Sequence, residues 1–210
     1  MTSRLIDFRY ELLDRNDLVK GEIDVLSGSV SLNSLAEIKR TGQFQIKENI
    51  LQDIDYLNDR IRPVVILDGV EYPMGVFLIP SPSRAKTDKG IIRSIEAYDK
   101  TQILKEDKLL DRYFIKQGTK YSTIITQIVN SAGIHNVTIE PTDLTLKRDR
   151  EFEPGLSKLS VVNNLLSECN YTSIYTDGNG MLRAESYILP NFRKVTQRYN
   201  DYEILNPKNL

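Results

Sequence analysis

Apolar and polar residues alternate through most of the first hundred positions, and this alternation constrains the fold more than any other feature of the sequence. Positions 6–12, for example, read IDFRYEL. Because successive side chains of a β-strand point to opposite faces of its sheet, the pattern predicts a strand with one buried face. The alternation returns around Val25, Val30 and Phe44. The first part of the chain is therefore expected to be β-rich.

A hairpin is predicted where the apolar segments 60–67 and 70–79 flank Asp68 and Gly69. These residue types accept the positive φ angles of the type I′ turn that joins antiparallel strands. Six or more strands with turns between them favour an antiparallel β-barrel or sandwich. We predict that residues 1–98 form this domain.

Polar and turn-forming residues fill positions 81–90, just before a strand expected over 91–98, and predict a mobile loop. The loop carries Arg84, Lys86 and Lys89. Positive charges on a mobile loop suit a salt-dependent contact with a partner, so these three residues are the candidate interface. A simple contribution to solubility explains them equally well.

The spacing of the apolar residues changes after Asp99 from that of a strand to that of a helix. Asp99 and Gln102 resemble a capping box, which predicts a short helix through Leu104. A longer helix is predicted after Thr119, which can cap its start, and Gly133 can close its end. Its apolar stripe consists of Tyr121, Ile124, Ile125, Ile128, Val129 and Ala132.

A third helix is predicted from Ser157 to Asn170, and its buried face holds Val162, Leu165, Leu166 and Cys169. A hairpin around the turn at 177–180 follows. Residues 99–190 are therefore predicted to form a small α+β domain. Residues 191–210 are expected to be a return segment or the start of a further domain.

Candidate catalytic groups are scarce. The chain has one histidine, His135, and one cysteine, Cys169. A zinc site needs several such ligands, and a Ser-His-Asp triad would have to use a histidine that lies in a predicted turn. Cys169 lies on an apolar stripe, where cysteine usually acts as a small hydrophobe. No nucleotide-binding glycine motif occurs. The sequence predicts no enzyme, no catalytic residue, no cofactor and no metal.

Two carboxylate pairs, Asp53 with Asp55 and Glu151 with Glu153, would each share a face of an extended segment. A glycosidase places such groups about 5–10 Å apart in a cleft, usually beside stacking aromatic residues. The chain has no tryptophan, and solvated faces are the favoured interpretation. The turn DGNG at 177–180 resembles the start of a calcium loop but lacks the bidentate glutamate, so a hairpin turn is favoured.

Charge and hydropathy narrow the range of partners. The 28 Lys and Arg residues nearly balance the 29 Asp and Glu residues, which gives a net charge of −1 and no field that would attract nucleic acid. No apolar run approaches the ~18 residues that span a bilayer, so stable membrane insertion is not expected. Charges near the N-terminus argue against a signal peptide, and synthesis in a cytosol is expected.

Short segments along the chain resemble, in order, tail proteins of phages that infect Gram-positive bacteria. They are DRIRP at 59–63, EYPMGVF at 71–77, SPSR at 81–84, EAYD at 96–99, RY at 112–113, FEPG at 152–155 and NY at 170–171. Each segment is short, but the ordered series covers most of the chain. The sequence resembles the N-terminal hub region of a tail-associated or baseplate hub protein.

This resemblance implies a gp27-type hub fold, in which β-barrel units like those of the tail tube carry small α/β domains. It implies a homotrimer in the virion that closes the tail tube and connects it to the distal tip. The implied neighbours are the distal tail or tube protein, the tape-measure protein, and a spike, fibre or lysin. It implies no catalytic residue.

The family usually continues beyond the point at which this chain stops, soon after Tyr202. The chain is therefore expected to be either part of a longer protein or a short hub. Two alternatives to the hub stay open, namely a module that binds host cell-wall carbohydrate and the N-terminal part of a tail-associated lysin. Glycan binding would distinguish the first alternative, and lysis of peptidoglycan the second.

Overall fold

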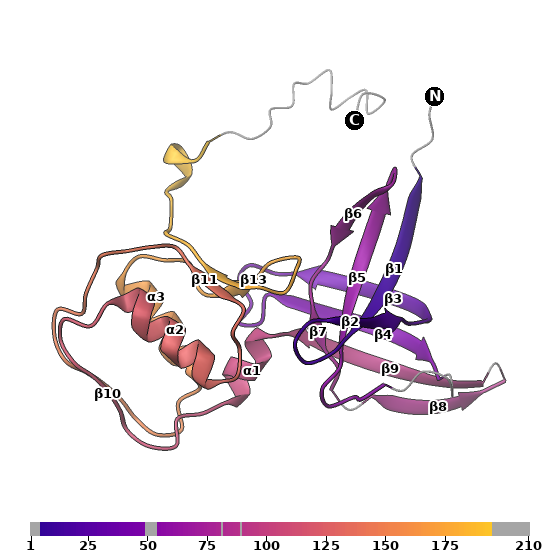
Figure 1. Ribbon diagram of the computed structural model, residues 1–210, viewed down its shortest axis with the longest axis horizontal. Coiled ribbons are helices and arrows are strands. Elements are labelled where there is room, and N and C mark those ends of the chain that lie inside the picture. Colours follow the sequence, from indigo (N-terminus) through magenta and orange to yellow (C-terminus); the bar gives the residue numbers. More distant parts are fainter. Residues whose placement is uncertain (1–4, 49–53, 81, 89, 195–210) are drawn as a thin grey trace.

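The computed structural model describes residues 5–48, 54–80, 82–88 and 90–194. A large antiparallel sheet comes first, and a smaller part with three helices follows (Figure 1). The predicted β-rich α+β class is confirmed. The division at residues 98 and 190 stays a prediction, and most of the segment 191–210 lies outside the described residues.

The sheet has nine strands, of which seven follow the order β2-β1-β5-β7-β9-β4-β3, while β6 pairs with β5 and β8 pairs with β9. The strands are β1 (Ile6–Leu13), β2 (Val19–Glu22), β3 (Val25–Leu32), β4 (Arg40–Lys47), β5 (Arg60–Leu67), β6 (Val70–Pro73), β7 (Phe77–Leu78), β8 (Ser83–Thr87) and β9 (Gly90–Asp99).

The two end strands of this order, β2 and β3, are consecutive in the chain and separated by Ile23 and Asp24. Within the described residues no ladder joins β2 to β3, so the sheet is not closed by hydrogen bonds there. A closed barrel therefore stays a prediction.

The sheet folds over its own core. In Figure 1, β1, β5 and β6 run across the direction of β3, β4, β8 and β9. Aromatic rings fill the space between them, because Phe44 contacts Tyr10 and Phe77 edge-on at ring-centroid distances of 6.1 and 5.7 Å. Gly28 makes room for this packing, since a Cβ there would lie 2.7 Å from the Tyr10 hydroxyl.

The hairpin predicted at Asp68 and Gly69 is confirmed, and both residues have positive φ angles, of 50° and 84°. The strand predicted over 70–79 is instead two strands, β6 and β7. The break contains Gly75, whose φ of 129° is incompatible with an extended strand.

The mobile loop predicted over 81–90 is wrong, because residues 83–87 form strand β8 and pair residue by residue with β9. Backbone hydrogen bonds hold this strand, and its side chains are largely exposed. An exposed edge strand therefore needs no apolar alternation, which explains why its polar composition was misleading.

The helical part contains α1 (Thr101–Glu106), α2 (Tyr121–Ser131), α3 (Lys158–Glu168) and a terminal 3-10 turn, η1 (Pro190–Phe192). Two small sheets flank the helices. They are formed by β10 (Tyr113–Ile115) with β12 (Arg150–Phe152), and by β11 (Val137–Ile139), β14 (Leu182–Ala184) and β13 (Tyr175–Thr176). None of the helices in the described ranges is long and apolar enough to span a membrane.

The two predicted N-terminal helix caps, Thr119 and the box of Asp99 with Gln102, are wrong, whereas Gly133 does close α2, with a positive φ of 79° directly after the C-cap residue Ala132. The Ser157 side chain caps α3 by accepting a hydrogen bond from the Ser160 amide at 3.1 Å. Thr119 precedes the N-cap residue of α2, Lys120, and donates its hydroxyl to the Lys116 carbonyl instead. The predicted box of Asp99 with Gln102 does not form, because Asp99 is buried and faces a different set of partners.

Asp99 helps to join the sheet to the helical part. Its carboxylate accepts hydrogen bonds from the backbone amides of Arg40 and Thr101 at 3.2 and 2.8 Å, and from the Thr176 hydroxyl at 3.0 Å. The Arg40 guanidinium extends the junction, because it donates to the carbonyls of Met74 at 2.6 Å and Thr176 at 3.0 Å. A buried carboxylate with this many donors fixes the backbone segments that it connects.

Candidate interaction surfaces

An uncovered apolar face lies at the free end of strands β1, β5 and β6, which we call the tip. Residues that are directly opposite each other in antiparallel strands share a face of the sheet. The pairing therefore places six apolar residues on one face of the tip. They are Ile6, Leu67 and Val70 in one row and Phe8, Val65 and Tyr72 in the next.

The residues of this face are buried near the core and exposed on the tip. Leu12 and Tyr10 lie on the same face of β1 as Phe8, and they pack against the core. Phe8 is 59% exposed and Ile6 56% exposed, and on β6 Val70 is 54% exposed. In Figure 1 this end of β1, β5 and β6 extends beyond the layer formed by β3, β4 and β9. The apolar face therefore continues past the part of the molecule that could cover it.

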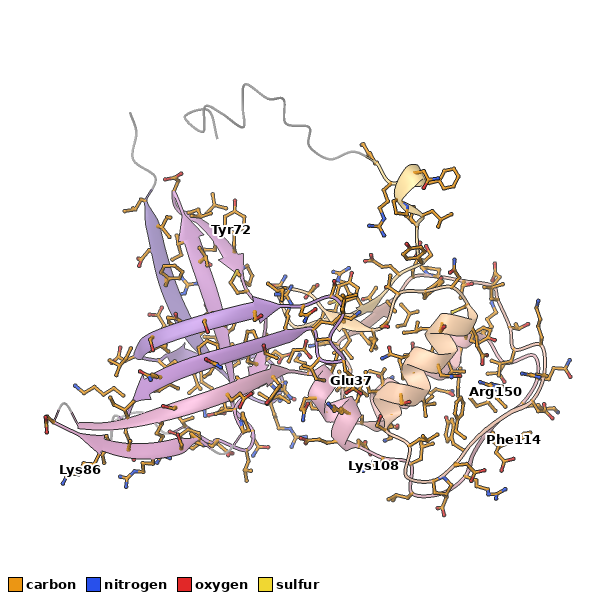
Figure 2. The ribbon with its side chains drawn as sticks, turned by 180° about the vertical axis from the view of Figure 1, so that it is seen from behind. Glu37, Tyr72, Lys86, Lys108, Phe114 and Arg150 are labelled. Carbon is orange, nitrogen blue, oxygen red and sulfur yellow. The ribbon has the colours of Figure 1, made fainter. Side chains whose placement is uncertain are left out.

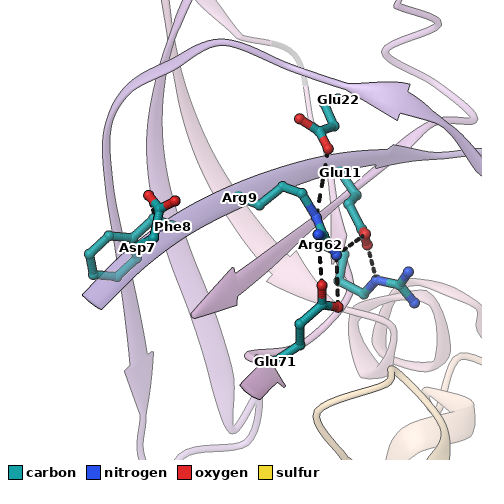
Figure 3. A network of polar contacts seen from close by, with 7 residues as sticks. All are labelled: Asp7, Phe8, Arg9, Glu11, Glu22, Arg62 and Glu71. Atoms are coloured by element: carbon teal, nitrogen blue, oxygen red, sulfur yellow. Dashed lines mark hydrogen bonds and ion pairs between the residues drawn. The ribbon is translucent and has the colours of Figure 1, made fainter. Parts of the chain in front are cut away.

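The opposite face of the tip carries two arginines that pair with three carboxylates (Figure 3). Arg9 donates two hydrogen bonds to Glu71, both at 2.8 Å, and a third to Glu11 at 2.9 Å. Arg62 also donates to Glu11, at 2.5 Å, and Glu22 lies 3.8 Å from Arg9. The hydrogen bond from Arg9 lowers the pKa of the Glu71 carboxyl. This face is suited to water, whereas the apolar face is suited to a protein surface.

Two of the predicted interface residues, Arg84 and Lys86, lie on strand β8 of the β8–β9 hairpin, at another extremity of the sheet. Arg84 pairs with Glu48 at 2.9 Å, and Arg93 pairs with the same carboxylate at 3.2 Å. Lys86 is exposed and has no acidic partner among the described residues. Lys89 lies outside the described residues, and a contact role for the three stays a prediction.

A shallow polar hollow of about 530 Å³ lies on the outer face of β3, β4 and β9. Among the described residues that line it, Glu96 is the one ionisable group. The other lining side chains are mostly serine and glutamine, such as Ser29 and Gln43. The hollow therefore lacks the paired acid and base that hydrolysis requires.

The described groups considered for catalysis belong to different elements, since Cys169 follows α3, Asp55 precedes β5 and Glu151 lies in β12. Cys169 is buried, and burial raises the pKa of its thiol, which opposes formation of a reactive thiolate. Asp55 closes a turn by accepting from the Asn58 side chain at 2.7 Å, and this bond lowers the pKa of the carboxyl. Its predicted companion, Asp53, lies outside the described residues. Exposed Arg112 pairs with the other two candidate carboxylates, those of residues 151 and 153.

No group of three or more potential metal ligands occurs within the part of the chain that the structure describes. In the turn at 177–180, Asp177 accepts hydrogen bonds from the amides of Asn179 and Met181 at 2.9 and 3.0 Å and from Arg183 at 2.7 Å. These donors satisfy the carboxylate in the way that is typical of a hairpin turn.

A charged junction that the sequence did not predict is centred on Asp17. Its carboxylate pairs with the buried ammonium of Lys100, with Arg60 at 2.7 Å, and with the side-chain amide of Asn136 at 3.0 Å. Burial lowers the pKa of Lys100. His135 lies beside this junction in a pocket of about 160 Å³. One carboxylate thus connects the sheet to the loop that precedes β11.

Comparisons with known proteins connect this architecture to phage tails. No protein-family model and no curated protein matches the sequence. A tail protein from Neisseria meningitidis MC58 has a similar structure, with a TM-score of 0.58 and 12% identity over 84% of this chain and 50% of its own. The chain shares the fold of phage tail proteins.

Two other structures support the same fold. The 43 kDa tail protein of prophage MuSo2 from Shewanella oneidensis gives a TM-score of 0.60 and 12% identity over 86% of this chain and 56% of its own. A chain of a PdpA–VgrG complex gives a TM-score of 0.60 and 9% identity over 97% of this chain and 40% of its own. This chain therefore spans about half the length of the proteins that it resembles. The predicted likeness to tail proteins is confirmed at the level of the fold, and the host group stays a prediction.

Proposed function

We propose that the chain is a structural subunit of a phage tail tip or baseplate, or of a related injection particle. In this role it acts as a hub or adaptor between the tail tube and the distal tip. The observation that carries the proposal is the shared fold, which extends over 84–97% of this chain in the three matches. The gp27-type hub role and the place in the virion belong to this proposal.

The surfaces of the molecule support a role in assembly. An apolar face that is more than half exposed at Ile6 and Phe8 is typical of a surface that another protein covers. The candidate nucleophile Cys169 is buried, and His135 lines the pocket beside the Asp17 junction, whose lining does not include Cys169. These features favour binding to neighbours over catalysis.

The proposed neighbours are those that the resemblance to a hub protein implies. The chain forms a homotrimer, contacts the distal tail or tube protein, and surrounds the end of the tape-measure protein. A spike, fibre or lysin attaches at the other side. A trimer built from head-to-tail contacts closes into a ring when the rotation between subunits is 120°.

The proposal is tested on tail particles purified from the organism that carries the gene. Gold-labelled antibody against the chain should mark one end of the tail, and quantitative mass spectrometry should give copies in a multiple of three. Absence of the chain from purified tails, when the tube protein is present, would refute the proposal. Binding of the isolated chain to host glycans, or clearing of peptidoglycan by it, would favour the carbohydrate-binding or lysin alternative.

A further inference from the structure

We propose that the pocket beside the Asp17 junction binds a phosphate group. The pocket has a volume of about 160 Å³ and lies between the sheet and the helical part. Figure 2 shows these two parts from behind, with Lys86 on the sheet and Arg150 on the helical part. The lining comes from the turn after β1, the first residue of β5, the residue between β9 and α1, and the loop after α2. A ligand in this pocket would therefore contact both parts, wherever the chain lies in a particle.

Cations outnumber carboxylates in this pocket. Its three cations are Arg15, Arg60 and Lys100. Asp17 is the one carboxylate among the described lining residues, and it pairs with both Arg60 and Lys100. The side chains of these two cations are only 13% and 3% exposed, so water compensates little of their charge. A second anion would stabilise the pocket, because a buried charge is costly unless an opposite charge accompanies it.

Two further carboxylates lie near these cations but are engaged elsewhere. Asp14, which is close to Arg60, accepts hydrogen bonds from two backbone amides of its own turn at 2.8 and 2.9 Å. Asp177, which is close to Lys100, pairs with Arg183 at 2.7 Å. Neither Asp14 nor Asp177 lines the pocket. The place of a second anion in the pocket is therefore not taken by a side chain of the described residues.

The pocket also has hydrogen-bond donors that no acceptor uses. The Nε of Arg60 is buried and has no hydrogen-bond partner within the described ranges. Arg15 is exposed, and no acceptor among the described residues engages its guanidinium. His135 adds a ring N–H from the helical part. Guanidinium groups are the usual ligands of phosphate oxygens in proteins, because they donate two parallel hydrogen bonds.

Size and charge favour phosphate over other anions. Liquid water takes up about 30 Å³ per molecule, so the pocket has room for a phosphate group but not for a whole nucleotide. The lining has two more cations than carboxylates. A phosphate ester carries a charge of about −1.5 to −2 at neutral pH, which balances this excess better than a single carboxylate does.

An adjoining hollow of about 440 Å³ gives the phosphate group two possible sources. The hollow shares Arg15 and Arg60 with the pocket, and most of its other lining is apolar, such as Leu57 and Ile79. The ligand is therefore either the free ion or a phosphate ester whose organic part lies in the hollow.

Calorimetric titration of the full chain with sodium phosphate at constant ionic strength tests the site. We expect saturable binding of one phosphate per chain, with a dissociation constant of about 1 mM or below. Arg15→Gln should weaken this binding at least about tenfold, because it removes a charged donor that has no structural partner. Arg148→Gln is the matched control and should bind like the wild type, since Arg148 is also exposed and has no partner among the described residues.

Urea denaturation separates specific binding from the general effect of the salt. Phosphate stabilises folded proteins because it is excluded from their surfaces, and this effect should be equal in the three proteins. Binding adds a further stabilisation, which should appear in the wild type and in Arg148→Gln but not in Arg15→Gln. Binding that Arg15→Gln leaves unchanged, or an equal response of all three proteins to phosphate, would overturn the inference.

Phenyl phosphate distinguishes the two sources of the phosphate group. Tighter binding of phenyl phosphate than of inorganic phosphate would identify an ester, and Leu57→Ser should then remove the difference, because Leu57 is 93% exposed in the hollow. Weaker or equal binding would identify the free ion. Both results support the phosphate site, whereas failure of both compounds to bind would refute it.

Discussion

The helical part buries its apolar residues, whereas the tip exposes several of them. In the helical part, Ile125, Leu165 and Leu166 are completely buried between helices and the two small sheets. On the tip, Ile6 and Phe8 continue the apolar face of β1 but are more than half exposed. The helical part therefore closes its own core, whereas the tip leaves a face that another surface can complete. We therefore expect the buried core of the helical part to contribute to stability and the exposed face of the tip to contribute to assembly.

Core truncation should give the largest effects and shows whether the two regions unfold together. Phe77 and Leu165 are both fully buried, in the sheet and in the helical part respectively. Phe77→Ala should lower the free energy of unfolding by about 3–5 kcal/mol, and Leu165→Ala by about 2–5 kcal/mol, through lost burial and a residual cavity. Urea denaturation followed by separate probes in each region measures this.

A loss below about 1 kcal/mol at either position would show that its core is less well packed than the structure indicates. Coincident transitions in both variants would show that the junction makes the regions one cooperative unit.

The charged junction should give the next largest effect. Asp17 balances Lys100 and Arg60, whose side chains are 3% and 13% exposed. Asp17→Asn keeps a residue that tolerates the positive φ of 67° but removes the negative charge. We expect a loss of about 3 kcal/mol, because a buried cation loses its partner.

The matched control is Asp143→Asn, since this carboxylate is fully exposed beside Lys120. Its effect should stay within about 0.5 kcal/mol. Equal effects of the two substitutions on the urea midpoint would contradict the role of Asp17 as a junction.

The contact between the hairpin turn and the sheet should give an intermediate effect. A Cβ added at Gly178 would lie 2.4 Å from the Pro73 carbonyl oxygen, so Gly178→Ala must move a backbone. We expect a loss of about 1–3 kcal/mol by overpacking. Gly21→Ala is the control, since it meets no atom within 4 Å, and thermal unfolding of both variants measures the difference. If Gly178→Ala were as stable as the control, the two regions would not be in contact there.

An effect of similar size is confined to the helical part and depends on pH. Burial, with a hydrogen bond to Glu168 at 2.9 Å, raises the pKa of the Tyr121 hydroxyl to about 12. A raised pKa in the folded state means that its stabilisation is complete below pH 10, the ordinary value, and is lost as the pH rises toward 12. Between these values the wild type should lose about 2 kcal/mol more than Tyr121→Phe, since each unit of pKa shift corresponds to about 1.4 kcal/mol. Parallel pH profiles of the two proteins would contradict the assignment.

The sequence correctly predicted those strands and helices in which buried apolar residues recur at the period of a strand or of a helix. The alternation over 6–12 and the stripe that includes Ile125 and Ile128 correspond to β1 and α2. Strand β8 was missed, because both of its faces are exposed and its backbone pairing leaves no pattern. Strands β10, β11 and β12 have three residues each, which is too short for a period.

The interaction surfaces were less predictable. Alternation placed Ile6 and Phe8 on the same face as Leu12, but it contains no information on how far the covering layer extends. The Asp17 junction joins residues that are distant in sequence, the farthest being Asn136, and no local motif marks it. Positive charge at Arg84 and Lys86 did draw attention to the hairpin, although its structure was predicted wrongly.

Whether another protein covers the tip can be measured by hydrogen exchange, compared between the free chain and purified tail particles. Amides of β1 and β6 near Phe8 and Tyr72 should exchange more slowly in the particle, because a neighbour covers the tip. Amides of α2 and α3 should exchange at the same rate in both. Unchanged exchange at the tip, with new protection on the helices, would show that the assembly surface lies on the helical part instead.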